Sequence, residues 1–176
     1  KINYPYILFV GKRKFNKNFN ELIRTYSKWR KNKEIFLLVV GQKWDSYEME
    51  MLNNLNINNK VVLIEDADDE KLMFLYNQAL LLVYPSLCEG FGIPILESMS
   101  CACPIVASKI PTTIEIASEI PFYFTPGNLE EFENALNLGL ESSLREEKIN
   151  LGNQWVKKYT WDNSALQHYN LYKQLI

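Results

Sequence analysis

Residues that bind metals or form disulfides are scarce in this sequence of 176 residues. It contains three cysteines, Cys88, Cys101 and Cys103, and a single histidine, His168. An odd number of cysteines without paired metal-ligand spacing argues against a disulfide framework or a zinc site. We therefore expect buried thiols in a reducing compartment, and a position on the surface for His168.

Long apolar runs and an excess of one charge are also missing. No stretch approaches the roughly 20 apolar residues that span a membrane, and residues 1–6 lack the layout of a signal peptide. The formal net charge of -2 argues against nonspecific nucleic-acid binding, so we expect no nucleic-acid partner. With 47% hydrophobic residues, the sequence predicts a globular, cytoplasmic protein with a single domain over residues 1–176.

The most informative stretch covers residues 84–106. The apolar run at 80–83 predicts a buried strand, which Pro85 closes. Two glycines then flank Phe91, where the backbone can adopt a positive φ or approach a ligand closely. Pro94 is typical of the first turn of a helix. The predicted order is therefore strand, glycine loop, helix and strand.

The start of this helix predicts an anion site, because free amide groups and the positive end of the helix dipole meet there. At about 100° per residue, Ile95, Met99 and Ala102 share one face, and Glu97 lies roughly opposite them. A carboxylate so close to a phosphate would repel it unless the carboxylate bound something else. Paired sugar hydroxyls suit that role, since an acidic residue binds ribose in dinucleotide folds.

Two glutamates, Glu89 and Glu97, are separated by seven residues, and the segment Pro-Ile-Val-Ala-Ser follows at 104–108. This pattern resembles the signature of retaining nucleotide-sugar glycosyltransferases of the GT-B fold, the group 1 family with glycogen synthase-like and mannosyltransferase-like members. The whole chain resembles their C-terminal, donor-binding half. The resemblance implies that Glu97 holds the donor ribose and that Glu89 lies beside the transferred sugar. It also implies contacts from the diphosphate and hexose to the backbone of Gly90, Phe91, Gly92 and Ile93.

A basic loop at 12–18 follows a predicted first strand at 6–10 and precedes a predicted helix. It therefore lies at the sheet edge where open α/β folds bind ligands. The resemblance implies an arginine and a lysine here that neutralise the donor diphosphate. Lys17 matches the lysine, whereas Lys12 takes the arginine position in the simplest alignment and Arg13 stands next to it. Both stay open as candidates, and the choice affects geometry because arginine can bind phosphate in a bidentate way.

An acidic motif at Asp66 and Asp68 has the Asp-x-Asp spacing with which another class of glycosyltransferases holds a divalent metal. The GT-B pattern makes a metal unnecessary, since lysines already offset the phosphate charge. We therefore expect these acids to cap the following helix. We expect no metal and no cofactor, because the nucleotide sugar is a substrate.

Two later segments carry weaker parts of the resemblance. Glu115 matches a family glutamate near the donor, but Thr112, Thr113 and Ile114 replace the usual glycine or proline, which puts a backbone contact from that loop in doubt. The segment 161–176 resembles the terminal helix that returns to the N-terminal domain in whole GT-B enzymes. Its apolar residues recur at helical spacing: Ala165, Tyr169, Tyr172 and Ile176.

Strands and helices alternate about six times, which predicts a Rossmann-like, doubly wound parallel sheet with helices on both faces, one half of a GT-B fold. The leading hypothesis is donor binding for a hexosyltransferase that uses a UDP- or GDP-sugar and a glycan or lipid-linked acceptor. In this hypothesis Lys17, with Lys12 or Arg13, stabilises the leaving diphosphate, and Glu89 orients the sugar.

Residues 1–6 lead directly into the first strand of the donor-binding half that the chain resembles, so we expect an N-terminal acceptor-binding domain elsewhere in the same, longer polypeptide. The chain alone should bind donor weakly and not turn over. The whole protein could associate peripherally with the inner face of the membrane. Alternatives are a nucleotide-sugar-binding module without transfer activity and a sugar-nucleotide epimerase of the GT-B fold. A dinucleotide-dependent oxidoreductase is disfavoured, because residues 11–16 lack the Gly-x-Gly-x-x-Gly turn.

Overall fold

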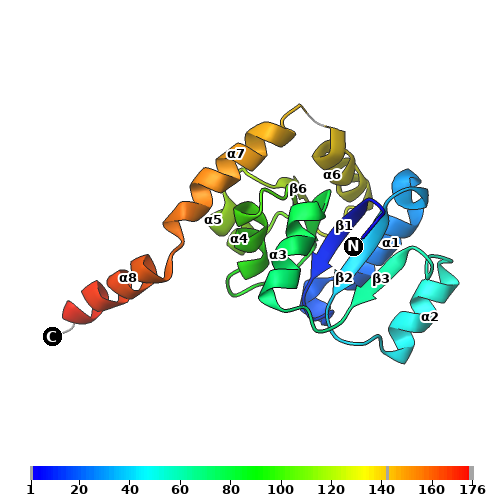
Figure 1. Ribbon diagram of the computed structural model, residues 1–176, viewed down its shortest axis with the longest axis horizontal. Coiled ribbons are helices and arrows are strands. Elements are labelled where there is room, and N and C mark those ends of the chain that lie inside the picture. Colours follow the sequence, from blue (N-terminus) through cyan, green and yellow to red (C-terminus); the bar gives the residue numbers. More distant parts are fainter. Residues whose placement is uncertain (1, 142, 175–176) are drawn as a thin grey trace.

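Six parallel strands form the centre of the computed structural model, which describes residues 2–141 and 143–174 (Figure 1). The sheet has the order β3-β2-β1-β4-β5-β6, and every pair of neighbours is parallel. The strands lie where the apolar runs predict them, with ends that shift by one or two residues. Their bounds are β1 Tyr6–Val10, β2 Phe36–Val40, β3 Val61–Ile64, β4 Leu81–Tyr84, β5 Ile105–Ser108 and β6 Phe122–Phe124.

Helices cover both faces of the sheet, so the predicted doubly wound architecture is confirmed (Figure 1). One face packs against α1 (Phe19–Lys28), α2 (Ser46–Asn54) and α6 (Leu129–Glu141). The other packs against α3 (Asp69–Gln78), α4 (Ile93–Ser100), α5 (Pro111–Ala117) and α7 (Arg145–Trp155). The central strands are buried on both sides, which is why their sequences are continuously apolar instead of alternating.

The strand order reverses direction between β1 and β4. The chain builds β1, β2 and β3 outward on one side, then crosses back through α3 and continues with β4, β5 and β6 on the other side. In open parallel sheets, the loops at the carboxyl ends of the two strands that flank such a switch form the usual ligand crevice. Here these loops are residues 11–18 after β1 and residues 85–92 after β4.

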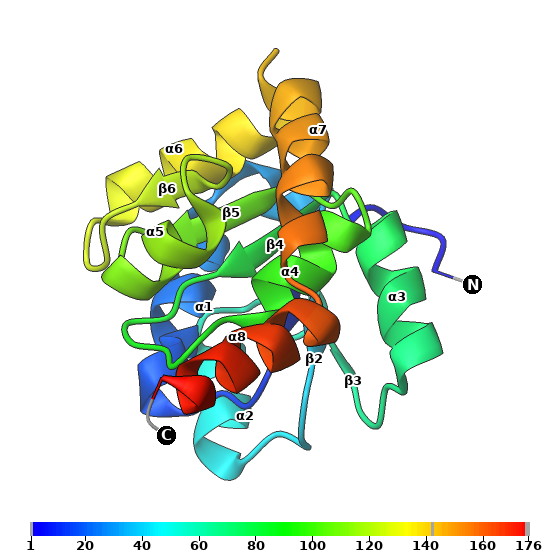
Figure 2. The ribbon, with the colours of Figure 1, turned by 90° about the vertical axis from the view of Figure 1, so that its left-hand side faces the viewer.

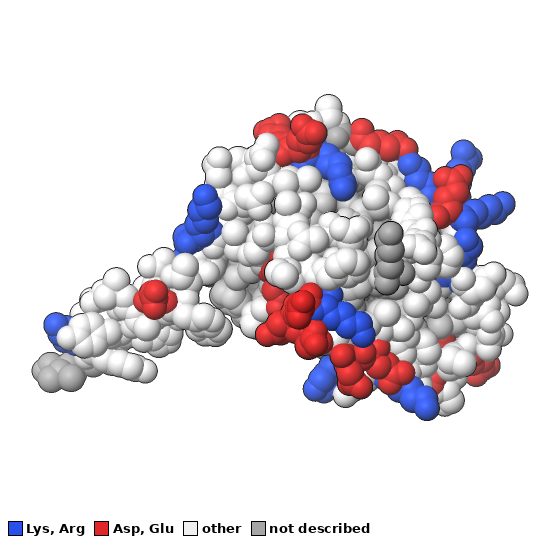
Figure 3. Space-filling view, in the orientation of Figure 1, with Lys and Arg blue, Asp and Glu red and all other residues white. Residues whose placement is uncertain are grey.

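Helix α8 (Trp161–Lys173) extends away from the rest of the chain after the short 3-10 helix η3, Val156–Lys158 (Figure 1). In the view of Figure 2 it lies in front of the other elements. No described residue of α8 is buried, and much of its visible surface is uncharged (Figure 3). Trp161 and Tyr172 are 86% and 60% exposed. The helix predicted at 161–176 is thus present through Lys173, while Ile176 lies outside the described residues.

Candidate functional site

The glycine loop and the start of α4 are built as the sequence predicts. Gly92 has φ of 119°, a left-handed conformation that favours glycine, and Pro94 occupies the first turn of α4. Ile95 and Met99 are buried, and Glu97 is half-buried. The expectation that Ala102 shares their face is wrong, because α4 ends at Ser100 and Ala102 turns outward.

Lys17 and Glu89 meet at the switch point. Lys17 lies in the short 3-10 helix η1 (Phe15–Lys17) after β1, and Glu89 lies in the loop after β4. The Lys17 ammonium contacts a Glu89 carboxylate oxygen at 2.6 Å, and the two side chains are only 19% and 10% exposed. The sequence predictions placed both residues at one site from positions 72 apart, and the structure brings them into direct contact.

Tyr84, the last residue of β4, lies under this ion pair. The Lys17 nitrogen lies 5.2 Å from the centre of the Tyr84 ring, close enough for a cation–π interaction. Burial, followed by the nearby Glu89 carboxylate, raises the pKa of the Tyr84 phenol above its ordinary value. Tyr84 therefore stays protonated at neutral pH, so the negative charge that faces Lys17 is that of Glu89.

Neighbouring elements hold the backbone of the Glu89 loop at several points. The Asn16 carbonyl accepts a hydrogen bond from the Leu87 amide at 2.8 Å, and the Asn16 side chain donates to the Cys88 carbonyl at 3.3 Å. On the other side, the Thr112 hydroxyl at the start of α5 donates to the Glu89 carbonyl at 3.0 Å. The resemblance implied no contact from this threonine, and only the folded chain reveals its side-chain hydrogen bond.

Arg13 faces away from Glu89 and toward α2. Its guanidinium forms an ion pair with Glu48 at 2.6 Å and donates to the carbonyls of Gln42 and Lys43 at 2.7 and 3.0 Å. The guanidinium also stacks over Trp44, with 4.3 Å between its central carbon and the ring centre. The Arg13 side chain is only 4% exposed, whereas Lys12 is exposed. Of the two candidates, Lys12 is therefore the one whose charge is accessible to a ligand.

Glu97 is held by Tyr76, for which helical spacing with Leu72, Leu75 and Ala79 predicts only a place on the inward face of its helix. Tyr76 of α3 is 1% exposed, and its hydroxyl donates to Glu97 Oε2 at 2.8 Å. A groove of about 310 Å³ runs beside the pair, between α3, α4 and η3. Burial first, and the Glu97 carboxylate second, raise the pKa of the half-buried Cys101 thiol in this groove.

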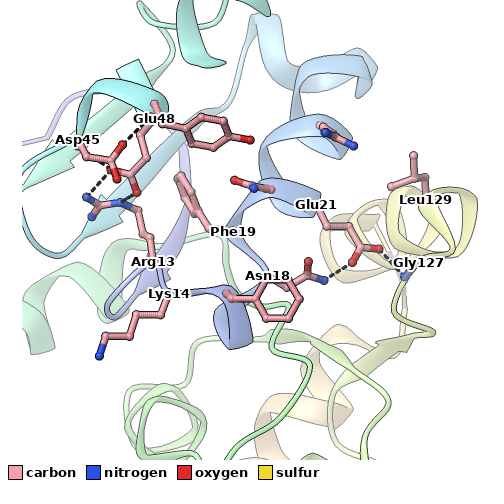
Figure 4. A pocket seen from close by; sticks show the side chains of 13 residues that line it. Arg13, Lys14, Asn18, Phe19, Glu21, Asp45, Glu48, Gly127 and Leu129 are labelled. Atoms are coloured by element: carbon pink, nitrogen blue, oxygen red, sulfur yellow. Dashed lines mark hydrogen bonds and ion pairs between the residues drawn. The ribbon is translucent and has the colours of Figure 1, made fainter. Parts of the chain in front are cut away.

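A larger cavity of about 570 Å³ lies on the far side of the 11–18 loop, toward α1, α2 and α6 (Figure 4). Its walls are fixed by internal hydrogen bonds. Glu48 and Asp45 form a capping box at the start of α2, and Glu21 accepts from the Asn18 side chain and from the Gly127 amide. The carboxylates that line the cavity thus already have partners, and two further cations, Lys14 and Arg24, line it together with Arg13.

No metal site stands out in the described part of the chain, where no three histidine, cysteine, aspartate or glutamate side chains gather as a metal would require. Asp68 instead caps α3, accepting from the Lys71 amide at 2.8 Å, as expected from its position. His168 is exposed. Among the described helices, none combines the length and the apolar character needed to cross a membrane.

Comparison with known proteins identifies the family to which this architecture belongs. A family model described as "Glycosyl transferases group 1" matches residues 1–156. The chain belongs to this family. Among curated relatives, the O-antigen chain mannosyltransferase RfbU of Salmonella typhimurium is 28% identical over 158 residues, which are 90% of this chain and 44% of the relative. An uncharacterized glycosyltransferase of Methanocaldococcus jannaschii, MJ1607, is 31% identical over 95% of this chain and 44% of the relative.

Solved structures with the same fold include a glycosyltransferase from Rickettsia africae, with a TM-score of 0.85 at 20% identity over 99% of this chain and 48% of that one. A sucrose-phosphate synthase from Thermosynechococcus elongatus gives a TM-score of 0.83 at 24% identity, over 98% of this chain and 46% of that one. At such identities the likeness establishes the fold alone. The chain spans slightly less than half the length of these relatives.

Proposed function

We propose that the chain binds the nucleotide-diphosphate sugar donor of a hexosyltransferase and acts as the C-terminal half of that enzyme. The contact between Lys17 and Glu89 at the switch point is the observation that carries the proposal. It joins a cation for the diphosphate to a carboxylate for the sugar, next to the amino-terminal end of α4. An ammonium has three donors, so Lys17 can bind a phosphate oxygen without releasing Glu89.

In this proposal the donor lies along the face of α4. Lys12 and Lys17 contact the diphosphate, Glu97 accepts hydrogen bonds from the ribose, and Glu89 orients the hexose. During transfer the two lysines would stabilise the negative charge that grows on the leaving diphosphate. Arg13 donates through Nε and one terminal nitrogen to Glu48 and two carbonyls, while its other terminal nitrogen is buried without a hydrogen-bond partner among the described residues. In this proposal Arg13 supports the loop and does not contact phosphate.

The transfer reaction belongs to the whole protein in this proposal. We propose that an acceptor-binding half completes the cleft, that the exposed apolar face of α8 packs on it, and that transfer proceeds with retention. Relatives named as mannosyltransferases make mannose the first hexose to test, on a glycan or lipid-linked acceptor at the cytoplasmic side of a membrane. UDP- and GDP-sugars are the donors to compare.

Calorimetric titration of the chain with UDP, GDP and ADP, with and without magnesium, tests donor binding. We expect one nucleotide to bind without a metal requirement. Glu97→Gln should weaken that binding by about 1.5 to 3 kcal/mol, the range for hydrogen bonds to a charged group. Glu133→Gln, at a half-buried position on α6, is the matched control and should bind like wild type. Absence of binding at millimolar nucleotide, or equal binding by the Glu97 and Glu133 variants, would contradict the proposal.

A further inference from the structure

Each of the two site glutamates depends on a hydroxyl from a different helix. The Tyr76 hydroxyl of α3 donates to the side chain of Glu97, and the Thr112 hydroxyl of α5 donates to the backbone of Glu89. The sequence motif gives neither hydroxyl a part in the site. We infer that Tyr76 and Thr112 are positioning residues that separately set the affinity for the nucleotide and for the sugar, an inference that rests on the proposed donor site.

Tyr76 fixes the direction in which Glu97 can accept hydrogen bonds. Its hydroxyl donates a hydrogen bond to Glu97 Oε2 at 2.8 Å, and its ring is fully buried against α4 and the sheet. Burial, and then Glu97, raise the pKa of this phenol above its ordinary value, so the hydroxyl keeps its proton and remains a donor at every physiological pH. The carboxylate is thereby held with Oε1 available to a ribose hydroxyl. Without the Tyr76 hydroxyl, Glu97 could rotate about its last torsion.

Thr112 acts on the peptide between Glu89 and Gly90. The segment before Glu89 is tied to Asn16 through Leu87 and Cys88, whereas Gly90 has open space where a side chain would be. Glycine gives this side of the peptide wide conformational freedom. The 3.0 Å hydrogen bond from Thr112 restrains the Glu89 carbonyl next to Gly90, where the backbone would otherwise have wide conformational freedom. Its loss should let the peptide rotate and carry the Glu89 side chain off Lys17.

Loss of each hydroxyl should therefore change the affinities for the nucleoside diphosphate and the sugar nucleotide in a different pattern. Tyr76→Phe keeps the ring and removes the hydroxyl. It should lower the affinities for a nucleoside diphosphate and for its sugar derivative by the same factor, about three- to tenfold. Thr112→Val replaces the hydroxyl by a methyl group and should weaken the affinity for the sugar nucleotide by about three- to tenfold. The affinity for the nucleoside diphosphate should not fall, because Lys17 keeps its charge. Thr112→Ser restores a hydroxyl and should recover sugar-nucleotide affinity.

Matched controls separate positioning from stability. Tyr26→Phe removes another buried tyrosine hydroxyl, which donates to the Ile35 carbonyl on the opposite face of the sheet. Thr25→Val makes the same side-chain change as Thr112→Val at a buried position on α1. Both controls should bind nucleotides like wild type, whatever they do to the melting temperature.

Calorimetry with GDP, GDP-mannose, UDP and UDP-glucose on these variants, with Glu97→Gln beside them, tests the inference. If wild type binds and Glu97→Gln binds less, but the Tyr76 and Thr112 variants match their controls, the positioning roles are overturned and the donor site stands. If wild type binds nothing, the donor site falls and both roles fall with it. Amide hydrogen exchange at residues 89–91 of the free chain should also be faster in Thr112→Val than in Thr112→Ser, and equal rates would refute the restraint on the loop.

Discussion

Replacing Arg13 and Lys12 one at a time distinguishes a structural cation from a ligand-binding one. Arg13 forms an ion pair with Glu48 beside the larger cavity, and their side chains are only 4% and 10% exposed. Breaking a buried pair by removing one partner costs about 3 to 5 kcal/mol, because an uncompensated charge stays buried. Glu48 would keep the Asp45 amide as a donor at 2.9 Å and the favourable end of the α2 dipole, so we place Arg13→Met at the lower end, about 3 kcal/mol.

Urea unfolding measures this cost. With a slope of about 1 to 3 kcal/mol per molar urea, Arg13→Met should lower the unfolding midpoint by about 1 to 3 M. Adding Glu48→Gln removes the stranded charge, so the double variant should be less destabilised than the sum of the two single variants. Lys12→Met, at an exposed position, should stay within about 0.5 kcal/mol of wild type.

Nucleotide binding completes the comparison. Lys12→Met should lose affinity for a nucleoside diphosphate without losing stability, and Arg13→Met should bind normally under conditions where it is folded. An Arg13→Met protein as stable as wild type that no longer binds nucleotide would refute this reasoning. It would mean that Arg13 leaves Glu48 to contact the diphosphate.

Three further predictions follow from packing and burial. Gly41→Ala should destabilise by about 1 to 3 kcal/mol, measured by thermal unfolding, because the new Cβ would lie 2.8 Å from the Gly11 carbonyl oxygen; wild-type stability would contradict the close approach of these two turns. Thr25→Val should leave stability unchanged or raise it, since its buried hydroxyl has no hydrogen-bond partner among the described residues; a clear loss in urea unfolding would reveal a missing partner. Cys101 should react slowly with iodoacetamide near neutral pH, because its raised pKa keeps the thiol protonated. Glu97→Gln should speed this reaction, because it removes a carboxylate that raises the thiol pKa. Equal alkylation rates for wild type and Glu97→Gln, measured by mass spectrometry across pH 7 to 9, would exclude the influence of Glu97.

The fold could be predicted almost completely from the sequence, because a buried parallel sheet requires continuous apolar strands and each strand is bounded by turn residues. The run at 36–40 and the run at 81–84 are examples. The end of α4 was predicted less well. Periodicity alone extended its buried face to Ala102, whereas the chain leaves the helix at Cys101 and Ala102 adopts a positive φ.

The charged residues of the candidate site could be nominated from the sequence, but the residues that hold them in place by hydrogen bonds could not. Lys17, Glu89 and Glu97 stand in a recognisable motif, so sequence alone nominated them. Tyr76 and Thr112 act through single hydroxyl groups that come from helices distant in sequence. Helical spacing places Tyr76 on the inward face, and its ring is indeed buried. The spacing does not predict which group its hydroxyl contacts.

The different surroundings of Lys12 and Arg13 likewise appear only in the structure. Both residues are basic and adjacent, and the motif could not separate them. Glu48, which forms the ion pair with Arg13, lies after β2 and 35 positions from Arg13 along the chain, and no local pattern links the two.

Amide hydrogen exchange with and without the tightest-binding nucleoside diphosphate tests the location of the donor site most directly. The account predicts slower exchange in two segments when the nucleotide is present, residues 11–18 after β1 and residues 89–101 along α4. It predicts no change at residues 45–48 and 127–133, which contribute to the larger cavity and not to the groove beside Glu97. Protection confined to residues 45–48 and 127–133, with none along α4, would contradict the assignment of the donor site.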